Sequence, residues 1–182
     1  MFTKKDRIEQ FKGIMKPAFP FGMQSIVQQL DKLGFFEAPA SISHHGNCSG
    51  GLFDHSICVT NCLLDLTQRL ELKWSRENSP YLVGMFHDLC KCDNYKRCPD
   101  GVDPEHWEYN NAAILTGHGD KSVIMLQRMV TLTDEEIACI RWHMGAFDDK
   151  DYWNNYGHAV TQFPNVLFTH TADMMAARIF QI

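Results

Sequence analysis

Hydrophobic positions recur along the chain with the spacing of amphipathic helices, and the strict alternation typical of strands is scarce. In the first segment, for instance, Ile8, Phe11 and Met15 fall on one helical face. The pattern predicts helices over residues 3–15, 23–34, 52–73, 80–90, 111–116, 119–131, 133–145 and 164–180.

Local signals mark some of the helix ends. Ser79 precedes Pro80, which pairs a capping residue with proline at the first helical position. Thr133 and Glu136 have the spacing of a capping box. Polar, aromatic and turn-forming residues predict irregular segments, the second with room for a short hairpin, over residues 38–51, 92–110 and 146–162. Because no repeat or linker interrupts the pattern, residues 1–182 are predicted to form a single all-α domain.

The composition of the chain argues against several classes of function. The net charge of −5 argues against an extended nucleic-acid surface, because binding phosphate backbones requires a basic footprint. The longest apolar stretches fall far short of the roughly 20 residues that a membrane-spanning helix needs. The first residues lack the apolar run of a signal peptide, and the seven cysteines are odd in number and scattered. We therefore expect free thiols in a cytoplasmic protein.

A histidine and an aspartate stand side by side at the end of an apolar helical segment. His87 and Asp88 lie in the string LVGMFHDLCK. A buried aspartate is costly unless it is paired or bound to a metal. A helix-ending histidine beside a capped aspartate is the purely structural alternative for this dipeptide.

Four further candidate ligands change that balance. They are His55 in GGLFDHSICV, His118 in TGHGDKS, His143 in RWHMG and Asp173 in FTHTADMMAAR. Each lies on a different predicted helix or helix end, flanked by core residues, and a helical bundle can direct such side chains to one internal point. Imidazole and carboxylate ligands suit zinc, iron, manganese or similar cations. Four neutral histidines and two aspartates are enough to hold two such ions.

The order His…His-Asp…His…His…Asp resembles the HD superfamily of metal-dependent phosphohydrolases, in its six-ligand, binuclear form. GGLFDHS is similar to that family's G-G-L-x-x-H-S entry to the first ligand helix, and FHDLCK is similar to its H-D-x-x-K signature. GHGDKS and RWHMG resemble the segments that carry the extra histidines. The resemblance spans about residues 44–178, with Cys90 standing where many relatives have glycine. It implies an HD-domain-like helical bundle with a metal site between the helices.

The resemblance also implies a role for each ligand. The first divalent metal ion would be held by His55, His87, Asp88 and Asp173, and Asp88 would bridge to a second ion completed by His118 and His143. With two dications the site carries a charge of about +2, which attracts a phosphate and lowers the pKa of a bound water toward ~7. The resulting hydroxide would attack the phosphorus of a small-molecule phosphate ester, a class that includes nucleotides.

Three cationic side chains are candidates for binding that substrate. Lys91 follows His87 by one helical turn, so it is predicted to face the same mouth and to act with Asp88 in catalysis. Lys121 and Arg141 lie close to predicted ligands in sequence and are weaker candidates, with a solvated helix face as the alternative. The roles of His44, His45 and the cysteine cluster at 90–98 are left open. Aromatic residues in the predicted loops either wall a pocket or form a satellite core (Tyr95, Trp107, Tyr109, Trp153 and Tyr156).

Two other functions fit the same ligands. HD-fold di-iron oxygenases, which act on small polyols or phosphonates, share this ligand order and also place a lysine after the His-Asp pair, so Lys91 does not discriminate. A non-catalytic ligand-binding domain is the third reading, and the complete ligand set argues against it. The sequence does not specify the substrate, the metal or the oligomeric state.

Overall fold

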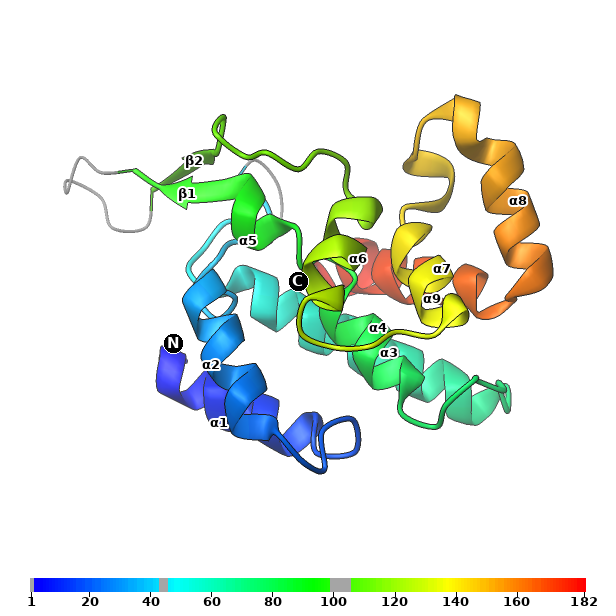
Figure 1. Ribbon diagram of the computed structural model, residues 1–182, viewed down its shortest axis with the longest axis horizontal. Coiled ribbons are helices and arrows are strands. Elements are labelled where there is room, and N and C mark those ends of the chain that lie inside the picture. Colours follow the sequence, from blue (N-terminus) through cyan, green and yellow to red (C-terminus); the bar gives the residue numbers. More distant parts are fainter. Residues whose placement is uncertain (1, 43–45, 99–105) are drawn as a thin grey trace.

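The computed structural model describes residues 2–42, 46–98 and 106–182, and these form a helical bundle with one small hairpin (Figure 1). The all-α fold class is therefore confirmed. In chain order the elements are α1 (Lys4–Ile14), α2 (Met23–Leu33), α3 (Gly51–Arg69), α4 (Ser79–Phe86), α5 (Lys91–Asn94), β1 (Tyr95–Arg97), β2 (Trp107–Tyr109), α6 (Gly119–Gln127), α7 (Asp134–Arg141), α8 (Trp153–Gln162) and α9 (Asn165–Met174). A π-helical segment, Met175–Phe180, continues α9.

The antiparallel hairpin β1–β2 lies within the segment where a hairpin was expected, with Tyr95 opposite Tyr109. A helix over 111–116 was predicted wrongly. The side chain of Asn110 accepts a hydrogen bond from the backbone N–H of Ala112, a local turn that competes with helix formation.

The segment 146–162 was also predicted wrongly, because α8 occupies its second half. Tyr156, Ala159, Val160 and Phe163 follow one another at helical spacing and pack against the core. That short period was hidden among the polar residues around it. In Figure 1, α8 stands at one side of the molecule, on the far side of α7 from the N-terminal helices.

The core begins as a cluster of phenylalanines beneath the N-terminal helices. Phe11, Phe35, Phe36, Phe53 and Phe86 are fully buried, and their rings meet mostly edge-on or tilted, with centroids 5.5–6.2 Å apart. Such ring pairs add stability beyond the apolar area they bury. The cluster packs α3 and α4 against α1 and the end of α2. This packing fixes the positions of the helices from which the polar side chains project.

Glu136 joins α7 to α4 from a fully buried position. It accepts hydrogen bonds from the hydroxyl of Ser79, at 2.8 Å, and from the side chain of Arg76. It also completes the predicted capping box with Thr133. The prediction that Ser79 caps a helix starting at Pro80 was wrong: Ser79 is already inside α4, Asn78 precedes it, and the hydroxyl serves Glu136 instead.

Two glycines allow helices to approach closely enough to assemble a polar site. A Cβ atom on Gly84 would lie 2.6 Å from Cα of Thr60, so glycine is needed where α4 crosses α3. A Cβ atom on Gly119 would lie 2.1 Å from the carbonyl oxygen of Arg141, where α6 begins beside the end of α7. Within the described ranges, no helix is both long enough and apolar enough to cross a membrane.

Candidate metal centre

The structure brings together the six side chains that the sequence predicted as ligands. His55 lies in the first part of α3, and His87 and Asp88 follow the end of α4. The others flank or lie in later helices: His118 immediately precedes α6, His143 follows α7, and Asp173 lies in α9. The rings of neighbouring histidines have centroids 4.9–5.3 Å apart. The start of α6 and the end of α7 thus place His118 beside His143, with ring centroids 5.1 Å apart.

Asp88 lies at the centre of the cluster, and its two carboxylate oxygens face different histidines. Oδ2 lies 3.5 Å from Nε2 of His87 and 3.9 Å from Nε2 of His55. Oδ1 lies 2.5 Å from Nε2 of His118 and 3.4 Å from Nε2 of His143. The carboxylate therefore stands between two pairs of imidazoles, which is the arrangement a bridging ligand needs.

Asp173 joins the first of these pairs. Its Oδ1 lies 3.1 Å from Nε2 of His55 and 3.8 Å from Nε2 of His87. The second pair, His118 and His143, has no comparable carboxylate of its own besides Asp88 among the described ion pairs. The two halves of the cluster therefore differ in the number of negative charges they offer.

Backbone carbonyls orient the histidine rings. Nδ1 of His87 donates to the carbonyl of Gly84 at 2.9 Å, and Nδ1 of His143 donates to the carbonyl of Ile140 at 2.7 Å. A carbonyl can only accept, so the proton is on Nδ1 and Nε2 is directed into the cluster. Both Nε2 atoms are buried, and neither has a hydrogen-bond partner in the part of the chain that the structure describes. Buried polar atoms without partners are rare, and a metal ion is one way to satisfy them.

The electrostatics of Asp88 reflect the positive groups around it. Burial alone would raise the pKa of this carboxyl, but the charges of Lys91, His118 and His87 hold it well below its usual range. Nζ of Lys91 lies 2.5 Å from Oδ2 of Asp88. Burial would lower the pKa of Lys91, yet the neighbouring Asp88 raises it overall. The carboxylate and the ammonium are thus both charged.

The other ionisable groups of the cluster differ in the direction in which their pKa values are shifted. Burial opposes the ionisation of Asp173, but the hydrogen bond with His55 and the charge of His87 lower its pKa. Burial lowers the pKa of His143 and outweighs the effect of the nearby Asp88 carboxylate, which raises it. For His87, the charge of Asp88 overcomes burial and raises the pKa. Metals bind neutral imidazole, so a metal ion here would displace protons from the cluster.

The donor atoms fit divalent metal ions. Three sets of ligand atoms lie within 4.8 Å of one another: His55, His87 and Asp88; His87, His143 and Asp173; and Asp88, Cys90 and His118. Nitrogen and carboxylate oxygen donors in this proportion suit zinc, manganese or iron. The residues present therefore fit the metals that the sequence predicts.

Cys90 is completely buried, and its thiol belongs to one of these sets. Its backbone N–H donates to the hydroxyl of Ser122. Burial raises the pKa of the Cys90 thiol to about 12, so the thiol is protonated near neutral pH and is a poor ligand in that state. The thiols of Cys48, Cys58, Cys62, Cys90, Cys92 and Cys139 are free.

A cavity of about 190 Å³ opens onto the cluster. Its lining includes polar groups of the candidate metal centre and Lys91, as the sequence predicted for that lysine. The other lining residues were not predicted. They are Met144, Phe147, His170, Met174, Ala177 and Arg178.

Lys121 and Arg141, the other predicted substrate-binding residues, do not line this cavity. Lys121 is fully buried, with Nζ 2.7 Å from a carboxylate oxygen of Asp93 and 2.7 Å from the side-chain oxygen of Asn94. Arg141 pairs with Asp120 at 2.5 Å and Asp148 at 2.6 Å. Both charges are thus already balanced by carboxylates, and a substrate-binding role for either residue stays a prediction.

Some remaining candidates have structural partners. Nδ1 of His170 donates to the carbonyl of His143 at 2.7 Å, so His170 helps to hold the segment that carries His143. The aromatic residues singled out in the sequence do not line the cavity (Tyr95, Trp107, Tyr109, Trp153 and Tyr156). His44 and His45 lie outside the described residues.

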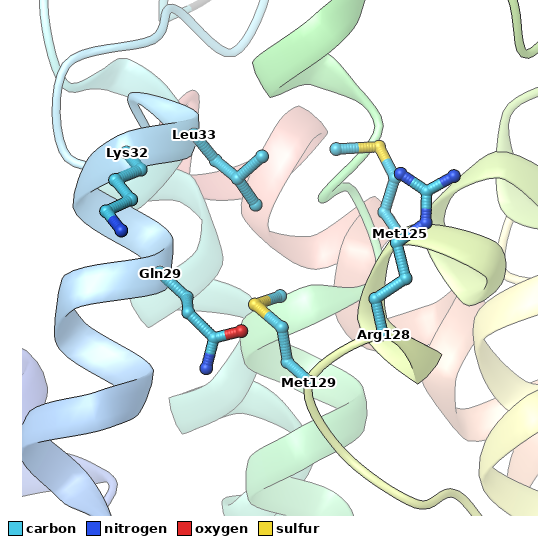
Figure 2. A pocket seen from close by; sticks show the side chains of 6 residues that line it. All are labelled: Gln29, Lys32, Leu33, Met125, Arg128 and Met129. Carbon is cyan, nitrogen blue, oxygen red and sulfur yellow. The ribbon is translucent and has the colours of Figure 1, made fainter.

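A second cavity, of about 350 Å³, lies between α2 and α6 (Figure 2). Met125, Met129 and Leu33 form its apolar lining, and Lys32 and Arg128 stand at its edge. None of the six candidate ligands lines it. The smaller cavity, by contrast, is lined by candidate ligands and by Lys91.

One comparison with known proteins bears on this site. A curated protein of Methanocaldococcus jannaschii, named dihydroneopterin 2',3'-cyclic phosphate phosphodiesterase, is 39% identical to the chain over 83 residues. These residues cover 44% of this chain, and the match spans 33% of the length of the relative. This distant homologue is, by its name, a phosphodiesterase. No protein-family model and no solved structure matches the chain.

Proposed function

We propose that this protein is a metal-dependent phosphohydrolase that cleaves a phosphate mono- or diester, with cyclic phosphodiesters and nucleotides as the first substrates to test. The observation that carries the proposal is the position of Asp88, whose two oxygens face His55 and His87 on one side and His118 and His143 on the other. The resemblance to the HD phosphohydrolases and the partial similarity to a cyclic phosphodiesterase support it.

In the proposed site, His55, His87, Asp88 and Asp173 hold one divalent cation, and Asp88, His118 and His143 hold another. Bound metal ions supply a hydroxide for attack on phosphorus and stabilise the charge on the phosphoryl oxygens. The bound metals would be zinc, manganese, iron or a similar ion. We propose that the whole chain serves this one site as a single domain.

Lys91 has the most direct role among the residues that are not ligands in this scheme. Its ammonium lines the cavity and lies within hydrogen-bonding distance of Asp88. In the proposed site this ammonium would contact a non-bridging phosphoryl oxygen of the substrate. Its positive charge is held in place before the substrate arrives, which is the condition under which electrostatic stabilisation of a transition state is strongest.

The proposed reaction is tested by stripping the purified protein with a chelator and reloading it separately with Mn²⁺, Zn²⁺ or Fe²⁺. Each form is then assayed with 2',3'-cyclic nucleotides, nucleoside monophosphates and bis(4-nitrophenyl) phosphate. Hydrolysis that requires metal supports the proposal. Oxygen consumption with a polyol or a phosphonate, without hydrolysis of any ester, would instead identify an oxygenase using the same ligands.

Lys91→Ala is expected to lower turnover of the best ester by about 10²-fold, because it removes a preorganised charge from the transition state. Metal content should be unchanged, since the amine is not a predicted ligand. Lys96→Ala is the matched control, because Lys96 is a half-exposed lysine of the hairpin that pairs with Glu108. Full activity of Lys91→Ala, alongside full activity of the control, would remove Lys91 from the mechanism.

A further inference from the structure

Among the lining residues that were not predicted is one cation, Arg178, at the far end of the helix that carries Asp173. Its side chain is exposed, and it forms no ion pair with any part of the chain that the structure describes. This distinguishes it from Lys121 and Arg141, whose charges are balanced by carboxylates. A guanidinium that opens onto a cavity with no counter-ion of its own is suited to bind an anion from solution.

The backbone explains how Arg178 reaches this cavity. Asp173 and Arg178 are five residues apart, a spacing that places two side chains on different faces of an α-helix, which turns 100° per residue. Here α9 changes into the π-helical segment Met175–Phe180, whose turn is wider. The change brings Arg178 to the same cavity as Asp173. Such π-helical interruptions occur frequently at functional sites.

Phe147 also lines the cavity and is 61% exposed, so much of its ring is open to solvent. Its ring lies beside His170, with centroids 6.3 Å apart. The side chains of Met144 and Met174 complete an apolar wall. An exposed ring against a methionine-lined wall offers a surface on which a flat group of a ligand can stack.

The size of the cavity limits what it can enclose. At about 190 Å³ it is smaller than the roughly 300–1,000 Å³ of pockets that enclose a whole drug-sized ligand. A phosphate and its immediate substituent fit inside, beside the polar cluster. The rest of a larger substrate would have to lie at the rim, where Phe147 and Arg178 are exposed.

We propose that Phe147 and Arg178 form a substrate clamp that selects phosphate esters of a flat aromatic heterocycle, such as a nucleobase or another fused nitrogen ring. Arg178 and Lys91 both line the cavity. Arg178 binds an anionic oxygen of the phosphate, and Phe147 stacks on the ring. This inference rests on the proposed function, because that function places the phosphate at the metal centre. The clamp itself acts on binding, so its effect on affinity can be measured without turnover.

The test is calorimetric titration of the Mn²⁺-loaded protein with guanosine monophosphate and with ribose 5-phosphate, which has the phosphate and sugar without the ring. The wild-type protein should bind the nucleotide about 10-fold more tightly, as expected for one aromatic stacking contact. Phe147→Ala should remove that preference while leaving the affinity for ribose 5-phosphate unchanged. Arg178→Ala should weaken both ligands by about 10-fold, and Arg178→Lys should recover part of the loss.

Phe21→Ala and Arg128→Ala are the matched controls, because both residues are exposed and lie outside this cavity. Neither should change either affinity. Equal binding of the two ligands by the wild-type protein, absence of binding, or an Arg178→Ala variant with unchanged affinities would overturn the clamp. If the clamp pattern is found but no ester is hydrolysed with any metal, the clamp stands and the proposed reaction fails.

Discussion

Replacing Asp88 with asparagine is expected to empty both metal positions and to lower ester turnover by about 10³-fold or more. Each oxygen of Asp88 faces one of the histidine pairs, so neither proposed ion keeps its full ligand set without it. The loss corresponds to the several kcal/mol of transition-state charge stabilisation that bound metals supply. Metal content is measured by elemental analysis, and turnover with the best substrate of the panel.

The asparagine variant is preferred to alanine because it keeps the shape of the side chain at a position that is 3% exposed. Circular dichroism and thermal unfolding establish that it is folded. Asp65→Asn is the matched control: Asp65 is half-exposed on α3, pairs with Arg69 and lies outside the cavity of the candidate metal centre. If Asp88→Asn retains the metal content of the wild-type protein, Asp88 is not a ligand and the proposed centre is wrong.

His118→Ala and His143→Ala are each expected to lower the metal content from two ions per chain toward one, with turnover reduced about 10²-fold or more. The reason is that both residues lie nearest Oδ1 of Asp88, whereas His55 and His87 lie nearest Oδ2, so the first ion keeps its proposed ligands when either is removed. The loss in rate follows if both ions stabilise the reacting phosphate, because one of the two electrostatic contributions is then gone.

The control for these variants is His158→Ala, since His158 is exposed on α8 and does not line the cavity. It should keep two ions and full turnover. A metal content that remains at two in both His118→Ala and His143→Ala would exclude these histidines as ligands. A fall to zero in both would show that the cluster binds its metals as one indivisible unit, against the two-part arrangement proposed.

The ligand cluster was accessible from sequence because its members sit at helix ends or on apolar helices, where an unpaired polar side chain is costly. His87 and Asp88 follow a completely buried stretch, and the structure places them at the centre of the cluster. The sequence alone does not predict how closely the helices approach one another. That approach depends on contacts such as Gly84 against Thr60, which only the packed structure reveals.

The cavity wall was harder to anticipate. Arg178 stands in the same string as Asp173, but five residues separate them, and α-helical spacing would have put them on different faces. The π-helical segment that reunites them has no simple sequence signal. Conversely, Lys121 and Arg141 are near ligands in sequence, yet long-range and local carboxylates balance their charges. Proximity in sequence to a ligand is therefore a weak guide to which cation meets the substrate.

The helix errors have the same origin, a balance between local and long-range forces. At 111–116, the Asn110 side chain closes a turn that the hydrophobic pattern did not reveal. At α8, four apolar residues at helical spacing find the core, although the surrounding segment is polar and aromatic. At 111–116 a side chain near the segment outweighed the hydrophobic pattern. At α8 the hydrophobic pattern was too short to be recognised in the sequence.

We propose that the histidine and aspartate cluster holds two metal ions bridged by Asp88. Anomalous X-ray diffraction from crystals of the Mn²⁺-loaded protein, collected at the manganese edge, tests this arrangement most directly. We expect two peaks ~3.5–4 Å apart, one beside His55, His87 and Asp173 and the other beside His118 and His143, with Asp88 between them. A cluster without a peak, or peaks bound elsewhere in the chain, would contradict it.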